Sequence, residues 1–191
     1  MRDLRPDVYG ATATLSADLD SLGVDRPVVY VTFGTLFGDV PTLRTVLEGL
    51  VDFDADIVVT VGNSIDPKAV DLARPNLIVR QFIPQGALLG RCQLVVNHGG
   101  SGSVLGPLHY GVPLLIVPMG ADQLENAEML EAGGVARVIE PGDLTAGRIA
   151  TTARAIVDDD DLRRKAIAAR DEIAAMATPA DVVPELEALA R

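Results

Sequence analysis

Short runs of β-branched and apolar residues alternate along this chain with segments whose apolar residues recur at helical spacing. This alternation constrains the fold strongly, because parallel strands joined by helices form one sheet that is covered on both faces. The sequence therefore predicts an α/β fold with a doubly wound, Rossmann-like parallel sheet of about six strands. The predicted strands lie at 27–35, 56–62, 76–82, 93–97, 113–118 and 135–139. The predicted helices lie at 41–52, near 67–73, and at 103–111, 122–134, 145–159, 161–177 and 179–190.

All of these elements fall within residues 27–191, which we take as one domain, since 191 residues suffice for a substantial core. Residues 1–26 carry no clear element and are interpreted as a linker or lead-in. The acidic run at 158–161 lies between two helical patterns and fits a solvated helix start, where acidic residues are favoured.

The composition excludes several classes of protein. The chain has 27 acidic and 16 basic residues, a net charge of −11, which argues against a nucleic-acid or anionic membrane partner. An anionic small molecule is still allowed, because a local site can oppose the overall field. The single cysteine, Cys92, leaves no internal disulfide. No apolar run approaches the roughly 20 residues of a membrane span, and the N-terminus lacks a signal-peptide pattern. We therefore expect a cytoplasmic protein without a membrane span.

The stretch VVNHGGSGSVL, residues 95–105, is the strongest functional signal. It lies between a predicted strand and a predicted helix, and ligands of parallel sheets bind at the carboxyl ends of strands. A helix N-terminus at that edge offers backbone N–H groups and a positive dipole end, which together bind anions. Glycines let a phosphate approach the backbone, and neighbouring side chains add donors. The residues in these roles are His98, Gly99, Gly100, Ser101, Gly102 and Ser103.

This stretch also allows two other interpretations. A plain turn without a ligand is one, although a flexible Gly/Ser segment is poorly placed between a buried strand and a helix. A serine hydrolase is the other, but its G-x-S-x-G elbow is incomplete here, because the string from Gly99 reads G-G-S-G-S. The only other histidine, His109, lies in the same predicted helix, and no aspartate stands between Ser103 and His109, so a Ser, Asp, His order is missing. His109 is interpreted as a partly buried packing residue.

Three further segments end predicted strands at the same edge of the sheet: FGT at 33–35, QFIPQGALL at 81–89 and PMGADQLENA at 118–127. Taken with HGGSGS, they resemble the C-terminal, donor-binding domain of GT-B glycosyltransferases of the UDP-glycosyltransferase superfamily. The resemblance is greatest to actinobacterial enzymes that decorate macrolides and other natural products, and it runs from about Pro27 to the C-terminus.

This resemblance implies a role for each matching residue. The diphosphate of a nucleotide sugar would lie against His98, the backbone of 99–103 and the Ser103 hydroxyl. Asp122 and Gln123 would hydrogen-bond the sugar. Phe82 would stack on the base, and Ile83 and Gln85 would face the base and ribose. The nucleotide-sugar-binding residues that we predict are Gly34, Thr35, Phe82, Ile83, Gln85, His98, Gly99, Gly100, Ser101, Gly102, Ser103, Asp122 and Gln123.

Some of these residues also have purely structural explanations. Phe82 alone fits a core position equally well, Gln85 fits a cap of the short helix after it, and Asp122 fits the N-cap of the next helix. Asn126 is interpreted as structural or as a secondary phosphate contact. Plant members of the superfamily carry a ribose-binding glutamate where this chain has Gly106. That difference suggests a deoxyribose donor, a dTDP-sugar.

The resemblance implies an inverting glycosyltransferase that passes a sugar from dTDP or UDP to an acceptor hydroxyl. No metal or other cofactor is expected, because there is no convincing Asp-x-Asp and the helix end and His98 would meet the diphosphate charge. Members of the superfamily are about twice this length, and their N-terminal domain holds the acceptor and the catalytic base. We expect that domain to be absent here, no catalytic residue in this chain, and nucleotide binding with little or no transfer.

Alternatives to an excised donor domain stay open at this point. The chain would also fit one subunit of a two-chain glycosyltransferase, or a non-catalytic nucleotide-sugar-binding module. A GT-B-fold nucleotide-sugar epimerase is a further alternative, which the combination of A-D-Q with H-G-G disfavours.

Overall fold

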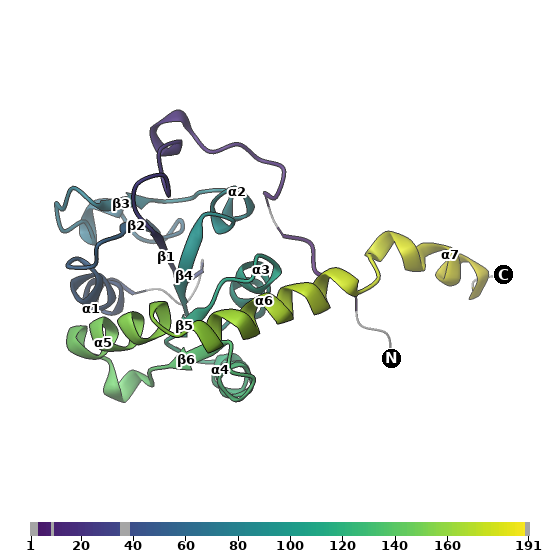
Figure 1. Ribbon diagram of the computed structural model, residues 1–191. Helices are drawn as coiled ribbons and strands as arrows, with labels where there is room; N and C mark the ends of the chain where they lie inside the picture. The colour runs from purple at the N-terminus through teal and green to yellow at the C-terminus, as the bar shows by residue number, and fades with distance from the viewer. Residues whose placement is uncertain (1–3, 9, 35–38, 190–191) are drawn as a thin grey trace.

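The structure is a computed structural model that describes residues 4–8, 10–34 and 39–189, apart from the side chain of Leu189 (Figure 1). Its centre is one parallel sheet of six strands in the order β3-β2-β1-β4-β5-β6, which confirms the predicted fold class. The strands are β1 (Val28–Thr32), β2 (Asp56–Thr60), β3 (Leu77–Arg80), β4 (Cys92–Asn97), β5 (Leu114–Ile116) and β6 (Ala136–Val138).

The strand order reverses between β1 and β4. The chain moves outward from β1 to β3, then returns to the other side of β1 and continues to β6. Such a reversal opens a crevice at the carboxyl ends of the two central strands, where ligands bind in sheets of this kind. In register, Thr32 of β1 lies beside Asn97 of β4, and Asn97 lies beside Ile116 of β5. The residues that follow these three positions therefore meet at one edge.

Helices cover both faces of the sheet (Figure 1). On one face, α1 and α5 pack against each other and share a core with the strands. On the other face, α2, α3, α4 and part of α6 share a second core. The helices are α1 (Val40–Leu50), α2 (Gln85–Leu89), α3 (Ser101–His109), α4 (Gln123–Ala132), α5 (Ala146–Val157), α6 (Asp160–Ala175) and α7 (Pro179–Leu189).

Strand β1 shows why the apolar runs are continuous. All five of its residues are buried, with Val29 and Val31 in one core and Val28 and Tyr30 in the other. A strand buried on both faces cannot alternate apolar and polar side chains. The near-continuous β-branched runs in the sequence thus follow from the position of these strands between two helical layers.

The segment before β1 is more structured than the sequence analysis expected. It contains a short 3-10 helix (Ala17–Leu19), and Leu15, Leu19 and Leu22 are buried in the second core. The Arg91 guanidinium donates hydrogen bonds to the backbone oxygens of this segment at Leu19, Asp20 and Leu22, over 3.4, 2.9 and 3.2 Å. These leucines recur at i, i+4 and i+7, the spacing of one helical face, but the segment forms only a 3-10 helix of three residues.

Most predicted bounds differ from the observed ones by one to three residues, and two differences matter for the site or for the type of element. Helix α3 begins at Ser101, two residues before the predicted start, because Gly100 has extended backbone angles and acts as the N-cap. The segment near 67–73 holds only a 3-10 helix (Pro67–Ala69). The early start of α3 moves Ser103 out of the turn and into the first turn of the helix, where it is buried.

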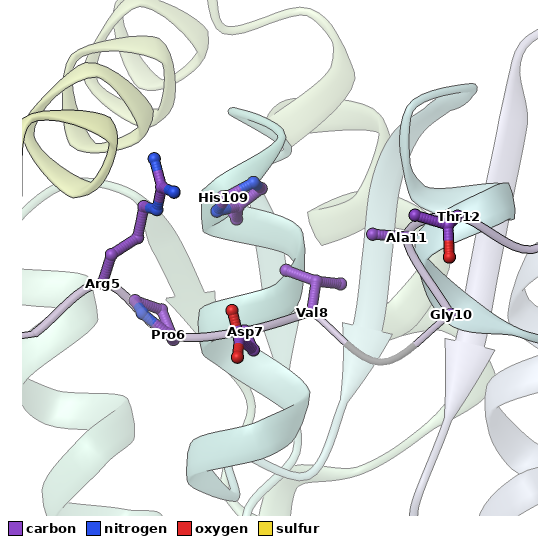
Figure 2. A pocket seen from close by; sticks show the side chains of 8 residues that line it. All are labelled: Arg5, Pro6, Asp7, Val8, Gly10, Ala11, Thr12 and His109. Carbon is purple, nitrogen blue, oxygen red and sulfur yellow. The ribbon is translucent and has the colours of Figure 1, made fainter. Parts of the chain in front are cut away.

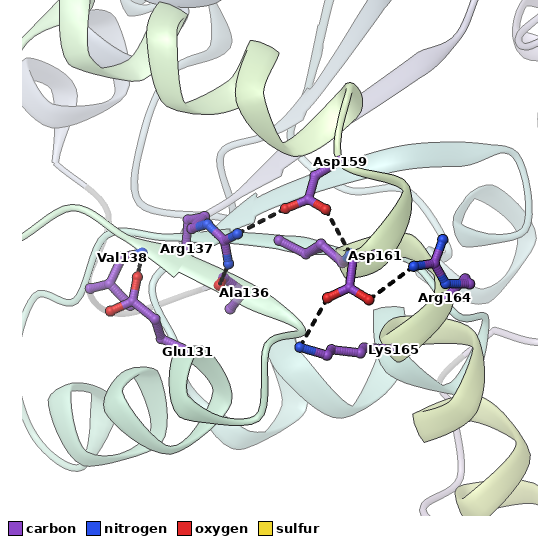
Figure 3. A network of polar contacts seen from close by, with 9 residues as sticks. Glu131, Ala136, Arg137, Val138, Asp159, Asp161, Arg164 and Lys165 are labelled. Atoms are coloured by element: carbon purple, nitrogen blue, oxygen red, sulfur yellow. Dashed lines mark hydrogen bonds and ion pairs between the residues drawn. The ribbon is translucent and has the colours of Figure 1, made fainter.

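Charged side chains connect β6 to the start of α6 (Figure 3). Asp159 caps α6 by accepting from the backbone N–H of Leu162, and its carboxylate lies 2.8 Å from the Arg137 guanidinium. Asp161 pairs with Arg164 and Lys165 on α6 itself. The acidic run is therefore a solvated helix start, as predicted, and its exposed ion pairs add little stability individually.

Helix α7 extends away from the sheet, and Val183 and Leu186 on it are exposed (Figure 1). A short parallel bridge joins Leu4 to Ala177, just before this helix. Across the described part of the chain, no helix is both long and apolar enough to cross a membrane.

Gly49 provides a test of how closely α1 packs on α5. A Cβ at this position would lie 2.5 Å from the backbone oxygen of Ala146 and 2.7 Å from Cβ of Ile149. Alanine usually stabilises a helix interior by about 1 kcal/mol over glycine. Here overpacking, which costs roughly 1–3 kcal/mol, should outweigh this gain in helix stability. Gly49→Ala should therefore lower the free energy of unfolding measured with urea.

Gly147→Ala in α5 is the control, because nothing lies within 4 Å of a Cβ there. It should leave stability unchanged or raise it slightly. A Gly49→Ala protein as stable as the parent would contradict the close packing of α1 on α5.

Candidate functional site

The loop between β4 and α3 stands at the point where the strand order reverses. Strand β4 ends at Asn97, and α3 begins at Ser101, so only residues 98–100 connect them. Such a short connection leaves the helix N-terminus at the carboxyl edge of the sheet. The glycine-rich stretch therefore occupies the position that its sequence predicted.

Asn97 fixes the geometry of this loop. Its side chain is fully buried, its Oδ1 accepts from the backbone N–H of Gly99 over 2.7 Å, and its Nδ2 donates to the backbone oxygen of Ser103 over 3.1 Å. One side chain thus ties the strand to both the turn and the first turn of the helix. Sequence analysis did not single out Asn97; an amide that ends an apolar strand before a glycine turn was the available signal.

Gly99 is required at the centre of the turn. Its φ of +87° lies in the left-handed region, and a Cβ there would lie 3.0 Å from both Ile116 Cγ2 and the backbone oxygen of Gln123. Its own oxygen accepts from Nδ2 of Asn126 over 3.0 Å. Asn126 therefore has the structural role that the sequence allowed, joining α4 to this loop.

His98 packs between two glycines. A Cβ on Gly100 would lie 2.6 Å from Nε2 of His98, and a Cβ on Gly34 would lie 3.1 Å from its Cε1. Only 7% of the residue is exposed. Burial lowers the pKa of His98, against smaller opposing effects of the Asp122 carboxylate and the Thr32 backbone. Near pH 7 the imidazole is therefore neutral, with a single N–H, and its ring hydrogen-bonds the Thr32 backbone.

The N-terminus of α3 is open where a ligand would approach. Ser101 and Gly102 are exposed, and nothing lies within 4 Å of a Cβ built on Gly102. The first N–H groups of a helix have no partner within the helix. By contrast, Ser103 is buried, and its N–H bonds to the Gly100 oxygen over 2.8 Å. The structure therefore presents the backbone of 101–102 to solvent and turns Ser103 inward.

The loop between β5 and α4 lies beside the glycine turn. Gln123 is buried, and its Oε1 accepts from the backbone N–H groups of Met119 and Gly120 over 2.7 and 3.2 Å. Ala121 has a φ of 54°, unusual for a residue other than glycine. Asp122 stands at the N-cap position of α4, yet its side chain makes no capping bond and is exposed. Gln123 thus shapes the loop, and the Asp122 carboxylate faces solvent beside it.

The residues that end β3 form a second part of the predicted site. Phe82 is 59% exposed, so the alternative that it belongs to the core was wrong. Ile83 is buried, and Gln85 is the first residue of α2, not its cap. Strands β2 and β1 separate β3 from β4, which places the end of β3 about 14 Å along the sheet from the end of β4, whereas Gln85 lies beside α3, near Gly106. Thr35 lies outside the described residues.

A buried polar chain runs beneath this region. The Tyr30 hydroxyl and Thr60 Oγ1 are 2.6 Å apart, and Thr60 Oγ1 donates to Thr32 Oγ1 over 3.1 Å. Burial raises the pKa of Tyr30 to about 12, while hydrogen bonds with Thr60, Thr32 and Gln85 oppose the rise. Gln85 is thereby linked to the strands at the centre of the sheet.

Two pockets border the segment before β1. One, of about 320 Å³, lies beside Phe82 and is lined by Thr14, Leu15, Ser16, Leu19, Arg80, Phe82, Ile83 and Pro84. The other, of about 400 Å³, is at the far end of α3 and is lined by residues 5–8, residues 10–12 and His109 (Figure 2). His109 is half-buried, and its ring meets the edge of Tyr110, as expected of a packing residue. None of the predicted binding residues borders the second pocket.

The described residues contain no group of three or more His, Cys, Asp or Glu side chains that would hold a metal ion. Cys92 is the only cysteine of the chain, and its thiol packs like a small apolar side chain. Burial raises the pKa of this thiol. The chemistry of the edge is therefore that of backbone N–H groups, one imidazole, hydroxyls and an exposed carboxylate. Such a set can hydrogen-bond an anion and hydroxyl groups.

Comparison with known proteins gives a consistent family. Residues 44–189 match the family model described as erythromycin biosynthesis protein CIII-like, C-terminal domain. Tylactone mycaminosyltransferase of Streptomyces fradiae is 36% identical over 171 residues, which are 86% of this chain and 37% of that protein. Erythronolide mycarosyltransferase of Saccharopolyspora erythraea is 31% identical over 156 residues, or 82% of this chain and 37% of that protein.

Solved structures agree with the sequence relatives. The glycosyltransferase VinC in complex with dTDP has a TM-score of 0.84 and 28% identity, over 99% of this chain and 47% of that one. The calicheamicin glycosyltransferase CalG4 has a TM-score of 0.80 and 26% identity, over 86% of this chain and 43% of that one. The chain spans 35% to 37% of the first curated relatives. Since the family model matches most of the residues, the chain belongs to the family of erythromycin biosynthesis protein CIII-like C-terminal domains.

Proposed function

We propose that this chain is the donor-binding domain of an inverting glycosyltransferase that moves a sugar from a nucleotide diphosphate, dTDP or UDP, to an acceptor hydroxyl of a natural product. The observation that carries the proposal is the open N-terminus of α3, with His98 packed between Gly34 and Gly100 beside it. This arrangement stands where the strand order reverses, the place at which parallel sheets bind nucleotides.

The diphosphate would lie against the backbone of 100–102, where the exposed Gly102 leaves room for it. The helix dipole contributes only about 0.3–1 kcal/mol, whereas micromolar affinity requires about 8 kcal/mol. Charge-assisted hydrogen bonds of roughly 1.5–3 kcal/mol each, from backbone N–H groups, Ser101 and His98, would supply much of the remainder. The same groups would stabilise charge that develops on the leaving diphosphate.

The nucleoside would extend from the glycine turn toward β3. The exposed ring of Phe82 offers a stacking surface for the base, and the pocket beside it has room for one. Gly106 is buried against Leu89, and a Cβ there would lie 3.9 Å from Oε1 of Gln85. No carboxylate stands at that position to bind ribose hydroxyls, which favours a deoxyribose donor, and the dTDP bound to the related VinC supports this.

The sugar would lie near Asp122, whose exposed carboxylate can accept from two hydroxyls. Gln123 would contribute through its backbone or Nε2, because its Oε1 already accepts two backbone hydrogen bonds. We further propose that the acceptor and the base that deprotonates it belong to another domain. A general base in that domain would deprotonate the acceptor hydroxyl, whose oxygen would bond to the anomeric carbon of the donor that this chain orients while the nucleotide diphosphate leaves.

Calorimetric titration of the purified chain with dTDP, UDP, GDP and ADP tests the proposal. Saturable binding of a pyrimidine nucleotide, weakened in His98→Ala, is the expected result. If none of the four nucleotides bound, this chain would not be a donor domain in its own right.

Gly102→Val should separate binding from folding. The added side chain meets no protein atom within 4 Å of its Cβ, but it would occupy the space in front of the helix. We expect dTDP affinity to fall at least about tenfold, or about 1.4 kcal/mol, with little change in the melting temperature. Gly147→Val is a matched control, since Gly147 is likewise the second residue of a helix with nothing within 4 Å. Equal dTDP affinity in both variants would argue against phosphate binding at α3.

The pH dependence of binding should report on His98. Burial lowers its pKa in the unliganded protein, and an adjacent diphosphate would raise it by favouring the imidazolium. Binding would then take up a proton between these two values, so affinity for dTDP should increase as pH falls through that window. Each unit by which the diphosphate raises the pKa of His98 corresponds to about 1.4 kcal/mol of binding free energy, or a tenfold change in affinity.

His98→Gln is the control for this profile, because it keeps a donor and cannot titrate. Protonation of the nucleotide, whose last pKa lies near 6, affects both proteins equally. The ratio of their dissociation constants between about pH 8 and pH 6 therefore isolates the imidazole. A constant ratio would show that His98 does not contact the phosphates.

A further inference from the structure

The hydroxyl group of Tyr30 lies inside the domain, below the edge of the sheet where the nucleotide would bind. Tyr30 is in β1, and its ring belongs to the core that the sheet shares with α2, α3 and α4. Thr32 and Thr60 end β1 and β2 side by side in register, and all three residues are buried. A buried hydroxyl costs free energy unless it is hydrogen-bonded, and phenylalanine would fill the same space without one. The Tyr30 hydroxyl therefore needs a role beyond packing.

The hydrogen bonds of these hydroxyls run in one direction. Thr60 Oγ1 donates its only hydrogen to Thr32 Oγ1 over 3.1 Å, so at its 2.6 Å contact with the Tyr30 hydroxyl it can only accept. Tyr30 therefore donates to Thr60, which uses its single hydrogen. At the other end, Thr32 Oγ1 also accepts from the backbone N–H of Gly34 over 3.4 Å, and Gly34 packs against His98. The chain of hydroxyls is thus anchored in the loop beside His98.

The Tyr30 oxygen can still accept a hydrogen bond, and the Gln85 amide donates to it. Burial raises the pKa of Tyr30, and Gln85, at the start of α2, opposes the rise through a side-chain hydrogen bond, as a donor to the phenol oxygen does. Because the Tyr30 hydrogen goes to Thr60, Gln85 takes part through its Nε2. Its Oε1 is then directed away from Tyr30, and a Cβ on Gly106 of α3 would lie 3.9 Å from it. The chain of hydroxyls thus determines which end of the amide is the donor toward the core and which is the acceptor on the other side.

We propose that Tyr30 is a positioning residue for the nucleoside, which holds the Gln85 amide so that Oε1 accepts from the deoxyribose hydroxyl of the bound nucleotide. This inference rests on the proposed function, in which the nucleoside extends from the glycine turn past Gln85 toward β3. A hydroxyl is a donor and suits an acceptor held in a fixed direction. A hydroxyl that only stabilised the fold would weaken every nucleotide equally when removed. The Tyr30 hydroxyl instead selects nucleotides that carry the deoxyribose hydroxyl, without touching them.

Tyr30→Phe tests this role, with dideoxythymidine diphosphate as a probe that lacks the deoxyribose hydroxyl of dTDP. The unaltered chain should bind dTDP about three- to tenfold more tightly than the probe, the contribution of one neutral hydrogen bond. In Tyr30→Phe this ratio should approach one, because the Gln85 amide loses its partner, while the affinity for inorganic pyrophosphate stays unchanged. Tyr110→Phe is the matched control, since Tyr110 follows the far end of α3 and packs against His109. An unaltered ratio in Tyr30→Phe, or an equal fall in Tyr110→Phe, would overturn the proposal.

Thr60→Val breaks the chain of hydroxyls and leaves both Tyr30 and Gln85 in place. Valine cannot accept from Tyr30, so the Tyr30 hydrogen is released and can be donated to Oε1 of Gln85, which turns the amide round. The preference for dTDP over the dideoxy probe should then fall as in Tyr30→Phe. Thr60→Ser keeps the hydroxyl and should keep the preference, and melting temperatures show whether both variants fold. Loss of the preference in both Thr60 variants, or in neither, would contradict an orienting role of the chain.

Binding by the unaltered chain distinguishes failure of this inference from failure of the proposed function. If neither dTDP nor pyrophosphate binds, the proposed function is rejected and this inference with it. If dTDP and the dideoxy probe bind equally well, the donor domain stands and the acceptor role of Gln85 is overturned. If the probe binds more weakly and the difference persists in Tyr30→Phe and Thr60→Val, Gln85 keeps its role and Tyr30 is not its positioning residue.

Discussion

The side chain of Asn97 carries the constraint on which the rest of the site depends. It is the last residue of β4, and its amide bonds both to the turn at Gly99 and to the first turn of α3 at Ser103. Because the amide is fully buried, losing either partner would leave a polar group unsatisfied, at a cost of roughly 1–3 kcal/mol. The orientation of the helix is thereby coupled to the sheet, and the backbone N–H groups of α3 point at a defined place before any ligand arrives.

The glycines around His98 determine how closely the backbone packs against the imidazole. Gly34 and Gly100 approach the imidazole so closely that a side chain on either would displace it, and Gly99 takes a backbone conformation that other residues avoid. These glycines serve the packing of the protein, whereas Gly102 leaves space on the solvent side. One glycine-rich motif therefore combines two physical requirements, a close-packed imidazole and an open helix end.

The order of strands and helices was predictable from sequence, because continuous β-branched runs and helical periodicity report directly on burial. The position of the glycine loop followed from the same pattern, as the loop joins a strand to a helix. Three features were not predicted: the role of Asn97, the start of α3 at Ser101, and the packing of Leu15, Leu19 and Leu22. The hydrogen bonds of the Asn97 amide and the backbone angles of Gly100 leave no mark on apolar periodicity. The three leucines recur at i, i+4 and i+7, so a signal was present, although the segment forms only one short 3-10 helix.

The two halves of the proposed site are held by different kinds of force, and this difference has consequences for ligand recognition. The glycine turn is fixed by buried hydrogen bonds and close contacts, so it suits a phosphate group, whose geometry is the same in every nucleotide. The pocket beside Phe82 is bounded by the segment before β1, which is held by the buried Leu15 and Leu19 and by one solvent-accessible ion pair to the end of β3. In the proposed complex the base would therefore meet a wall held mainly by apolar packing, whereas the phosphates would meet a turn held by directed hydrogen bonds.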